Sequence, residues 1–287
     1  MARIAYANGV YAPISAPMIC AEDRGYQFSD GVYEVLLLVD GLLWDAPGHL
    51  ARWQRSLDEL EIAAPMSEPA MRSIIRQVVR RNRLRNALIY MQATRGIMSR
   101  NHVYPQPAAP SFVVTARPFD LSASHAKAEK GVKLMTAPDI RWSRADIKSI
   151  SLLPNVLAKE KARQSGAAEA MFHRDGIVTE GGSTNIWMVD DHGAIRTHPL
   201  SRRILGGITR ASVVQCAQEM QMTVLEDAFT LDDAKSAREV FITSATSLVI
   251  PATHIDETPI SDGEPGPVAT ALRESYERYC RNTGICP

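Results

Sequence analysis

Alternating hydrophobic and polar positions predict two β-hairpins near the start of the chain. Residues 3–11 (RIAYANGVY) place an Asn-Gly pair between two short strands, and residues 32–44 (VYEVLLLVDGLLW) place an Asp-Gly pair in the same way. Both dipeptides accept the positive φ angles that two-residue hairpin turns require. Two more strands are expected at 87–95 and 111–118, with an irregular loop between them at 96–110.

Two segments between these strands repeat their apolar residues every three or four positions, which is the period of a helix. They are 48–62 (GHLARWQRSLDELEI) and 67–84 (SEPAMRSIIRQVVRRNRL). In the second segment Ser67 can cap the start and Pro69 suits the first turn. The first part of the chain therefore mixes helices and strands.

The second half begins with a strand at 132–137, followed by a helix that starts at Pro154 and ends at Gly166. Residues 169–199 then predict a meander of short strands, with a turn at the Asp-Gly pair 175–176. Polar and small residues dominate the preceding segment 119–131, which lacks a strand period.

The last part of the chain starts with a glycine turn that leads into a helix near Thr209. Thr230 can cap the following helix. The segment 239–251 (EVFITSATSLVIP) predicts a final buried strand. Taken together, the pattern predicts an N-terminal α+β domain at 1–118, an interdomain linker at 119–131 and a C-terminal α/β domain at 132–287.

Composition excludes several classes of protein. The 287 residues are 45% hydrophobic and carry equal numbers of basic and acidic side chains, so no net charge favours nucleic acid or a membrane surface. There is neither a membrane-spanning apolar run nor a signal-peptide core at the start, which predicts a cytoplasmic protein. The four cysteines form no CxxC pair and no zinc spacing, so free thiols and no metal site are expected.

Lys148 is unusual among the seven lysines because Ile147, Ser149 and Ile150 surround it. A desolvated lysine loses its proton more easily, and a neutral amine can attack a carbonyl. A lysine with a buried stem and a solvated head would leave the same pattern. The sequence around Lys148 leaves both interpretations open.

Two glycine-containing turns offer further chemistry. In LGGITR (205–210) a helix begins after two glycines, and its free N–H groups and dipole can bind a phosphate, although a plain tight turn fits equally well. In VTEGGSTN (178–185) Glu180 ends a strand, where a carboxylate can hold a cationic ring nitrogen or only form a salt bridge.

The irregular loop supplies Arg100 and His102, which could hold a substrate carboxylate or simply face solvent. A Schiff-base lysine, an acid for a pyridine nitrogen and a phosphate cradle are together what pyridoxal phosphate requires. Lys148, Glu180 and the 206–209 turn supply these three functions in one predicted domain.

Five ordered motifs complete a resemblance to the fold-type IV family of pyridoxal-phosphate enzymes. They are EDRGYQFSDGVYEV, TRGIMSRNH, DIKSISLLPNVLAKEKA, TEGGSTN and ILGGITR, and they span nearly the whole chain. The resemblance implies an α+β, two-domain architecture like that of D-amino acid aminotransferases. It also implies a pyridoxal 5'-phosphate cofactor and small-molecule substrates.

The resemblance implies a role for each matching residue. Lys148 would form the Schiff base and move the proton, and Glu180 would pair with the pyridine nitrogen. The other residues implied to hold the cofactor are Arg52, Leu205, Gly207, Ile208, Thr209, Ser244 and Ala245. Ala245 stands where the family's D-aminotransferases carry threonine, so a hydroxyl contact to the phosphate is missing there.

The substrate class is implied by Tyr33 and the pair Arg100 and His102, and Ser183 is expected as a further substrate contact. In D-amino acid aminotransferases such a Tyr, Arg and His hold the α-carboxylate, and the last two come from the neighbouring subunit of a homodimer. The resemblance therefore implies ping-pong transamination between D-amino acids, such as D-alanine, and 2-oxo acids. The alternatives are a transaminase for branched-chain L-amino acids or (R)-amines, and more distantly a non-catalytic pyridoxal-phosphate binder.

Overall fold

The computed structural model describes residues 3–104 and 107–287, which divide into two compact units. The first unit contains the chain up to Asp120 together with Ile147–Ser151 and Thr283–Pro287, and the second contains Leu121–Asp146 and Leu152–Asn282. Both units combine helices with a mixed or antiparallel sheet, which confirms the predicted α+β class.

The first unit is built on a sheet of six described strands in the order β2-β1-β6-β5-β3-β4, with every pair antiparallel. The strands are β1 (Ile4–Ala7), β2 (Val10–Pro13), β3 (Gly31–Val39), β4 (Leu42–Leu43), β5 (Ala87–Thr94) and β6 (Ser111–Pro118). Asn8 and Gly9 take φ angles of 47° and 96°, as a two-residue turn requires. Both predicted hairpins are therefore confirmed.

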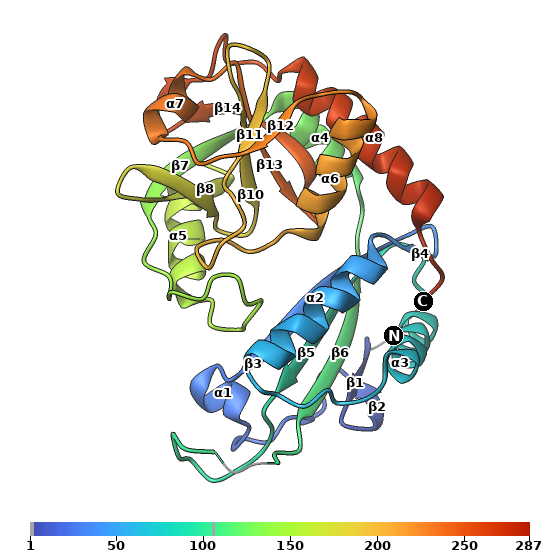
Figure 1. Ribbon diagram of the computed structural model, residues 1–287. Helices are drawn as coiled ribbons and strands as arrows, with labels where there is room; N and C mark the ends of the chain where they lie inside the picture. Colours follow the sequence, from blue (N-terminus) through green and yellow to red (C-terminus); the bar gives the residue numbers. More distant parts are fainter. Residues whose placement is uncertain (1–2, 105–106) are drawn as a thin grey trace. The chain divides into compact units, whose positions relative to one another are not determined.

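Three helices accompany this sheet: α1 (Arg24–Phe28), α2 (Ala46–Glu59) and α3 (Glu68–Arg81). Helix α2 crosses the sheet beside β3 (Figure 1) and buries Leu50, Trp53 and Leu57, the stripe that its sequence predicts. Ser67 is the N-cap of α3 as predicted, although its side chain makes no capping hydrogen bond.

The second unit holds a sheet of nine described strands in the order β12-β11-β10-β13-β14-β7-β8-β9, with β15 paired to β14. The strands are β7 (Val132–Pro138), β8 (Glu169–Arg174), β9 (Ile177–Gly181), β10 (Asn185–Val189), β11 (Ile195–Thr197), β12 (Val224–Glu226), β13 (Glu239–Ser244), β14 (Leu248–Ile255) and β15 (Thr258–Pro259). The pairs β7–β8, β7–β14 and β11–β12 are parallel.

The helices of the second unit are α4 (Ser122–Lys130), α5 (Leu153–Gln164), α6 (Ile208–Glu219), α7 (Leu231–Ser236) and α8 (Pro267–Thr283). Pro154 lies in the first turn of α5, and Gly166 follows the helix with a φ of 78°. Thr230 caps α7 in a complete capping box with Asp233. These three predictions are confirmed.

The structure differs from the sequence prediction at several points. Within the predicted linker, residues 122–130 form α4, whose Ser124 hydroxyl donates to the Ser247 carbonyl at 2.8 Å, so this segment belongs to the second unit. Segment 239–251 is two antiparallel strands, β13 and β14, because a turn at 245–247 interrupts it. Helix α8 was not predicted.

The predicted meander is also only partly right. β8–β9 and β10–β11 are hairpins, but β9 and β10 are not neighbours in the sheet order. They approach each other at the connecting loop, where the Gly181 N–H donates to the Thr184 carbonyl at 2.7 Å. The end of β9 and the start of β10 are thereby brought together around Glu180.

Candidate active site

Lys148 lies in the short segment Ile147–Ser151, which belongs to the first unit and not to the predicted C-terminal domain. The segment runs along the start of β3, where the Tyr33 N–H donates to the Lys148 carbonyl at 3.0 Å. The Lys148 N–H donates to the Ser56 hydroxyl at 3.3 Å, and Ile147 is buried in the core of the unit. The backbone of Lys148 is therefore held firmly on both sides.

The half-buried Lys148 side chain places its ammonium over the Tyr33 ring, 4.4 Å from the centroid. Tyr33 stacks in turn on Tyr90, whose hydroxyl donates to Gln92 at 2.7 Å. Burial, with a contribution from Tyr33, raises the pKa of Tyr90 to about 12. The structure thus brings together Lys148 and Tyr33, two of the residues predicted to meet the substrate.

Arg52 lies on α2 four residues before Ser56, about one helical turn from the position that contacts Lys148. Its Nε and Nη2 donate to the two oxygens of Glu34 at 2.6 and 2.9 Å, and His49 contacts the same carboxylate at 2.8 Å. Burial opposes ionisation of Glu34, but Arg52 and His49 outweigh it and hold its pKa well below the usual range. This buried ion pair orients the Arg52 guanidinium, whose contact with a phosphate stays a prediction.

Arg100 and His102 both pack against Phe28 of α1. The Arg100 guanidinium lies 4.4 Å from the centroid of the Phe28 ring, and the His102 ring lies 5.3 Å from it. Both side chains are exposed. β3 begins at Gly31 and pairs there with the end of β5, and Lys148 lies beside this start of β3. Helix α1 and the loop after β5 lie at the same end of the first sheet (Figure 1).

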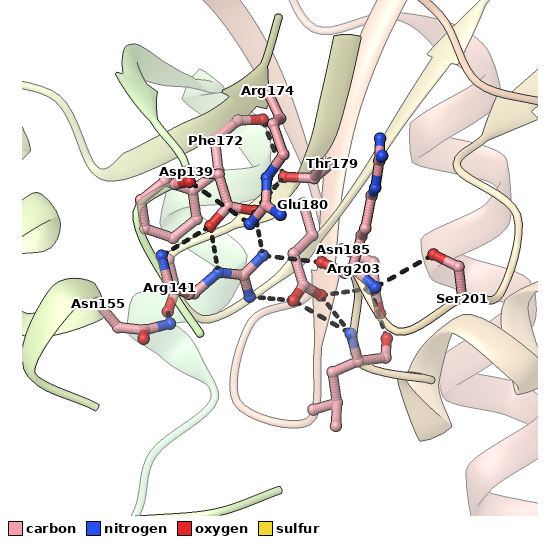
Figure 2. A network of polar contacts seen from close by, with 12 residues as sticks. Asp139, Arg141, Asn155, Phe172, Arg174, Thr179, Glu180, Asn185, Ser201 and Arg203 are labelled. Carbon is pink, nitrogen blue, oxygen red and sulfur yellow. Dashed lines mark hydrogen bonds and ion pairs between the residues drawn. The ribbon is translucent and has the colours of Figure 1, made fainter. Parts of the chain in front are cut away.

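Glu180 stands at the end of β9 in the second unit and is the centre of a polar network (Figure 2). Its carboxylate accepts hydrogen bonds from the Arg141 guanidinium, from the Asn185 amide at 3.1 Å and from the Leu205 N–H at 3.0 and 3.1 Å. Arg141 also binds Asp139 through Nε and Nη2, each at 2.9 Å. The orientation of Glu180 is therefore set by three donors.

The same network controls the ionisation of the Glu180 and Asp139 carboxyls. Burial raises the pKa of Glu180 to about 7, although Arg141 and the Leu205 N–H favour its charged form. Burial would also raise the pKa of Asp139, but the hydrogen bonds from Arg141 hold that pKa below its usual value. The pKa values of these two neighbouring carboxyls therefore differ, and that of Glu180 is the one raised toward neutral pH.

The glycine turn before α6 is tied directly to Glu180. Asn185 donates to the Leu205 carbonyl at 3.0 Å as well as to Glu180, and a Cβ at Gly207 would lie 2.0 Å from the Asn185 Oδ1. Gly207 is the N-cap of α6 and provides no side-chain cap, so the helix start offers N–H groups to an anion. Thr209 is buried in the first turn, with its hydroxyl 3.4 Å from that of Tyr276.

The remaining predicted site residues lie in turns of the second unit. Ser244 ends β13 and Ala245 begins the turn to β14, where the Ser247 N–H donates to the Ser244 hydroxyl at 3.1 Å. Ser183 is exposed, and its hydroxyl donates to Glu169 at 2.8 Å and lies 3.1 Å from the Lys159 ammonium. Ile208, the first residue of α6, is half-buried.

Sequence reasoning missed the partners that orient these groups. Arg141 and Asp139 are only two residues apart, but nothing local shows that Arg141 reaches Glu180 across 39 positions. Glu34 looks like an ordinary polar position in a strand, yet it is fully buried beside Arg52. Asn185 ends the TEGGSTN motif and could have been noticed there.

Comparison with known proteins identifies the family. Residues 31–255 match the model of the family described as amino-transferase class IV. The chain belongs to this family. It is therefore an aminotransferase that acts on small molecules, and its family depends on pyridoxal 5'-phosphate.

Relatives of this family match almost the entire chain. A D-alanine aminotransferase of Staphylococcus aureus (strain N315) is 38% identical over 281 residues, covering 98% of this chain and 99% of the relative. A D-alanine aminotransferase of Bacillus licheniformis is 42% identical over 272 residues, covering 93% and 95%. The crystal structure of a branched-chain amino acid aminotransferase with pyridoxamine 5'-phosphate superposes with a TM-score of 0.89 at 28% identity, covering 98% of this chain and 95% of that structure.

The side chains present fit the cofactor of this family. The turn at Gly207 leaves no room for a Cβ and precedes the uncapped start of a twelve-residue helix, as a phosphate cradle requires. Glu180 is a buried carboxyl that is 4% exposed, with a fixed orientation suited to a ring nitrogen. Lys148 supplies the primary amine, with its backbone fixed at both peptide groups.

Proposed function

We propose that this aminotransferase exchanges the amino group between D-amino acids, such as D-alanine, and 2-oxo acids in a ping-pong cycle. The observation that carries the proposal is the pairing of Arg100 and His102 on Phe28, which sets a guanidinium and an imidazole against the same ring. A planar guanidinium with a neighbouring imidazole binds a carboxylate by charge and hydrogen bonds. The two D-alanine aminotransferases at 38% and 42% identity support the same substrate class.

In this proposal each residue has a defined role. Pyridoxal phosphate, when bound, supplies the aldehyde and the electron-accepting ring. Arg52, the Gly207–Thr209 turn and the Ser244–Ala245 turn would hold its phosphate, Leu205 would pack on its ring, and Glu180 would accept the hydrogen bond from its ring nitrogen.

The Lys148 amine takes the proton from the substrate α-carbon and later returns a proton to the cofactor. Tyr33, Arg100 and His102 hold the α-carboxylate, and Ser183 is proposed as a further substrate contact. With the carboxylate fixed, the α-hydrogen of only one enantiomer can face Lys148, which sets the handedness. Lys148 acts in its uncharged form, because only a neutral amine has a free electron pair with which to take the proton.

The test is a substrate panel on the purified holoenzyme. D-alanine, L-leucine and (R)-1-phenylethylamine are each supplied with pyruvate or 2-oxoglutarate, and product formation is measured. D-alanine with 2-oxoglutarate should be turned over fastest, and Lys148→Ala should abolish turnover while the exposed Lys161→Ala should not. Fastest turnover of L-leucine or of the amine would assign the chain to one of the alternatives. Failure of D-alanine to change the cofactor spectrum would point to a non-catalytic binder.

We also propose a homodimer in which Arg100 and His102 serve the site of the partner subunit. Two exposed apolar side chains belong to the same segments as the pair and its Phe28 partner: Val103, which follows His102, is 77% exposed, and Tyr26 of α1 is 82% exposed. Neighbouring exposed apolar groups on one surface favour contact with another protein. The carboxylate of a bound D-amino acid would then contact Tyr33 of one chain together with the Arg100 and His102 side chains of the other chain.

A complementation experiment tests this arrangement. Lys148→Ala and Arg100→Ala proteins, each weakly active or inactive alone, are mixed under conditions that exchange subunits. If the arginine acts across the dimer, about a quarter of wild-type turnover should return, because half the dimers are mixed and each of these has one intact site. No recovery despite exchange, shown by mass spectrometry, would refute the arrangement.

No helix within residues 3–104 and 107–287 is long and apolar enough to cross a membrane. The four cysteines all lie within the described residues and form no disulfide, and two of them, Cys20 and Cys286, are exposed. Exposed free thiols persist where the environment is reducing. They support the cytoplasmic location that we propose.

A further inference from the structure

Arg24 is a buried arginine of the EDRGYQFSDG segment that the proposed mechanism does not use. Only 4% of the residue is exposed. Its Nη1 donates to the Asn101 carbonyl and its Nη2 to the His102 carbonyl at 3.4 Å. One guanidinium therefore holds two successive peptide groups of the loop that carries Arg100 and His102.

The Arg24 guanidinium is itself fixed by Asp30, whose carboxylate it contacts through Nε at 2.7 Å. Asp30 also binds Arg95 in a bidentate pair, with distances of 2.9 and 3.1 Å. Arg95 donates further to the carbonyls of Glu61 at 3.0 Å and Leu60 at 2.7 Å. The loop is thus anchored through Arg24 and Asp30 to Arg95 at the end of β5.

Aromatic contacts hold the same loop on two sides. The Tyr104 ring lies 3.7 Å from the Arg95 guanidinium carbon and 5.5 Å from that of Arg24. The Phe28 ring lies 4.7 Å from the Arg24 guanidinium carbon and also contacts the side chains of Arg100 and His102. Displacing Arg24 would therefore disturb both the backbone of His102 and the ring on which the pair packs.

We propose that Arg24 is a positioning residue for carboxylate recognition, which orients Arg100 and His102 by fixing the Asn101 and His102 carbonyls. The inference rests on the proposed function of the loop. Lysine cannot replace this arginine, because its single ammonium lacks the planar fork that reaches Asp30 and two carbonyls together. Arg24 and the loop belong to the same chain. Arg24 therefore positions the loop whether the loop serves the active site of its own subunit or that of the partner subunit.

The experiment compares D-alanine with D-alaninamide, which has the same side chain but no carboxylate. The kcat/KM ratio of the two substrates is measured in single turnovers for the wild-type holoenzyme and for Arg24→Lys. The ratio should fall about 10- to 100-fold in the variant, since a misplacement of 1 Å can cost about 100-fold, and D-alaninamide turnover should stay within about threefold of wild type. Arg85→Lys, an exposed arginine that also donates to a backbone carbonyl, is the matched control and should keep the wild-type ratio.

The outcomes separate the inference from the function on which it rests. A high wild-type ratio that Arg24→Lys leaves unchanged, or an equal loss for both substrates, would overturn the positioning role. A wild-type ratio near one would instead overturn the proposed carboxylate trap. If Arg24→Lys does not fold, Asp30→Asn keeps the shape of that side chain but removes the charge that fixes the Arg24 guanidinium, and it should lower the same ratio.

Discussion

Replacing Arg141 by glutamine should shift the ionisation of Glu180 toward higher pH. Burial already raises the pKa of Glu180 to about 7, and Arg141 is the main group that opposes this rise. Two unit charges 4 Å apart at an effective dielectric constant of 20 interact with about 4 kcal/mol, and opposite charges at such distances lower an acid's pKa by about 1–3 units. We therefore expect the pKa of Glu180 to rise by about 1–3 units in Arg141→Gln.

Activity against pH is the first assay. Only an ionised Glu180 can balance a protonated ring nitrogen, so the acid side of the kcat profile should move up by the same 1–3 units. At pH 7 the ionised fraction, and with it turnover, should fall about fivefold or more. Arg174→Gln is the matched control, because Arg174 lies 3.6 Å from Asp139 and the donors of Glu180 remain in place. Its profile should stay within about half a pH unit of wild type.

Stability against pH is a second assay that does not depend on turnover. An acid with a raised folded pKa stabilises the fold below its unfolded value of about 4.5, and this contribution is lost as pH rises toward the folded pKa. The Glu180 contribution in wild type should be lost by about pH 7. In Arg141→Gln the unfolding free energy should keep falling, by about 1.4 kcal/mol per pH unit, up to about pH 8–10. Identical acid limbs and identical stability slopes in the two proteins would refute the electrostatic reasoning.

Two further predictions concern the residues that support the site. Glu34→Gln should lower the unfolding free energy at pH 7 by about 3–5 kcal/mol, since it leaves Arg52 and His49 buried without a carboxylate. Because the pKa of Glu34 is held low, its contribution is present above about pH 4.5 and lost in acid, so urea denaturation of variant and wild type should converge as pH falls to 3 and below; a constant difference would contradict this. Gly207→Ala should cost about 1–3 kcal/mol and weaken pyridoxal-phosphate binding in a titration, because the new Cβ would collide with Asn185. Gly206→Ala, whose Cβ would meet only Leu200 at 3.6 Å, should retain wild-type stability.

Local signals explain which elements the sequence could predict. The Asn-Gly and Asp-Gly turns, the proline at the start of α5 and the cap of α7 depend on a few adjacent residues, and each is observed. Helix α8 also has a local signal, because its buried residues Ala269, Leu272, Tyr276 and Cys280 recur at helical spacing, and it could have been predicted. By contrast, the turn at 245–247 interrupts a run of strand-forming residues and has neither glycine nor proline to mark it.

The site shows the same division between local and distant information. Lys148 and Glu180 could be proposed from the sequence because their immediate neighbours are unusual for charged residues. The ion pairs of the site could not be predicted. Arg141 binds Glu180, and Arg52 binds Glu34, only after distant segments of the chain have folded together. The place of Lys148 in the first unit also depends on pairing with β3, which no local pattern indicates.

The distant partners also account for the difference in chemistry between the buried acids. Glu34 and Glu180 are both nearly inaccessible, yet the pKa of Glu34 is held low and that of Glu180 is raised to about 7. Glu34 accepts hydrogen bonds from Arg52 and also contacts His49, whereas Glu180 shares the Arg141 guanidinium with Asp139. Both acids are buried, but sharing one guanidinium between two carboxylates leaves Glu180 less stabilised in its charged form than Glu34. An Asp139→Asn substitution would therefore lower the pKa of Glu180, since Arg141 would then serve a single charge, and the acid side of the kcat profile should move to lower pH.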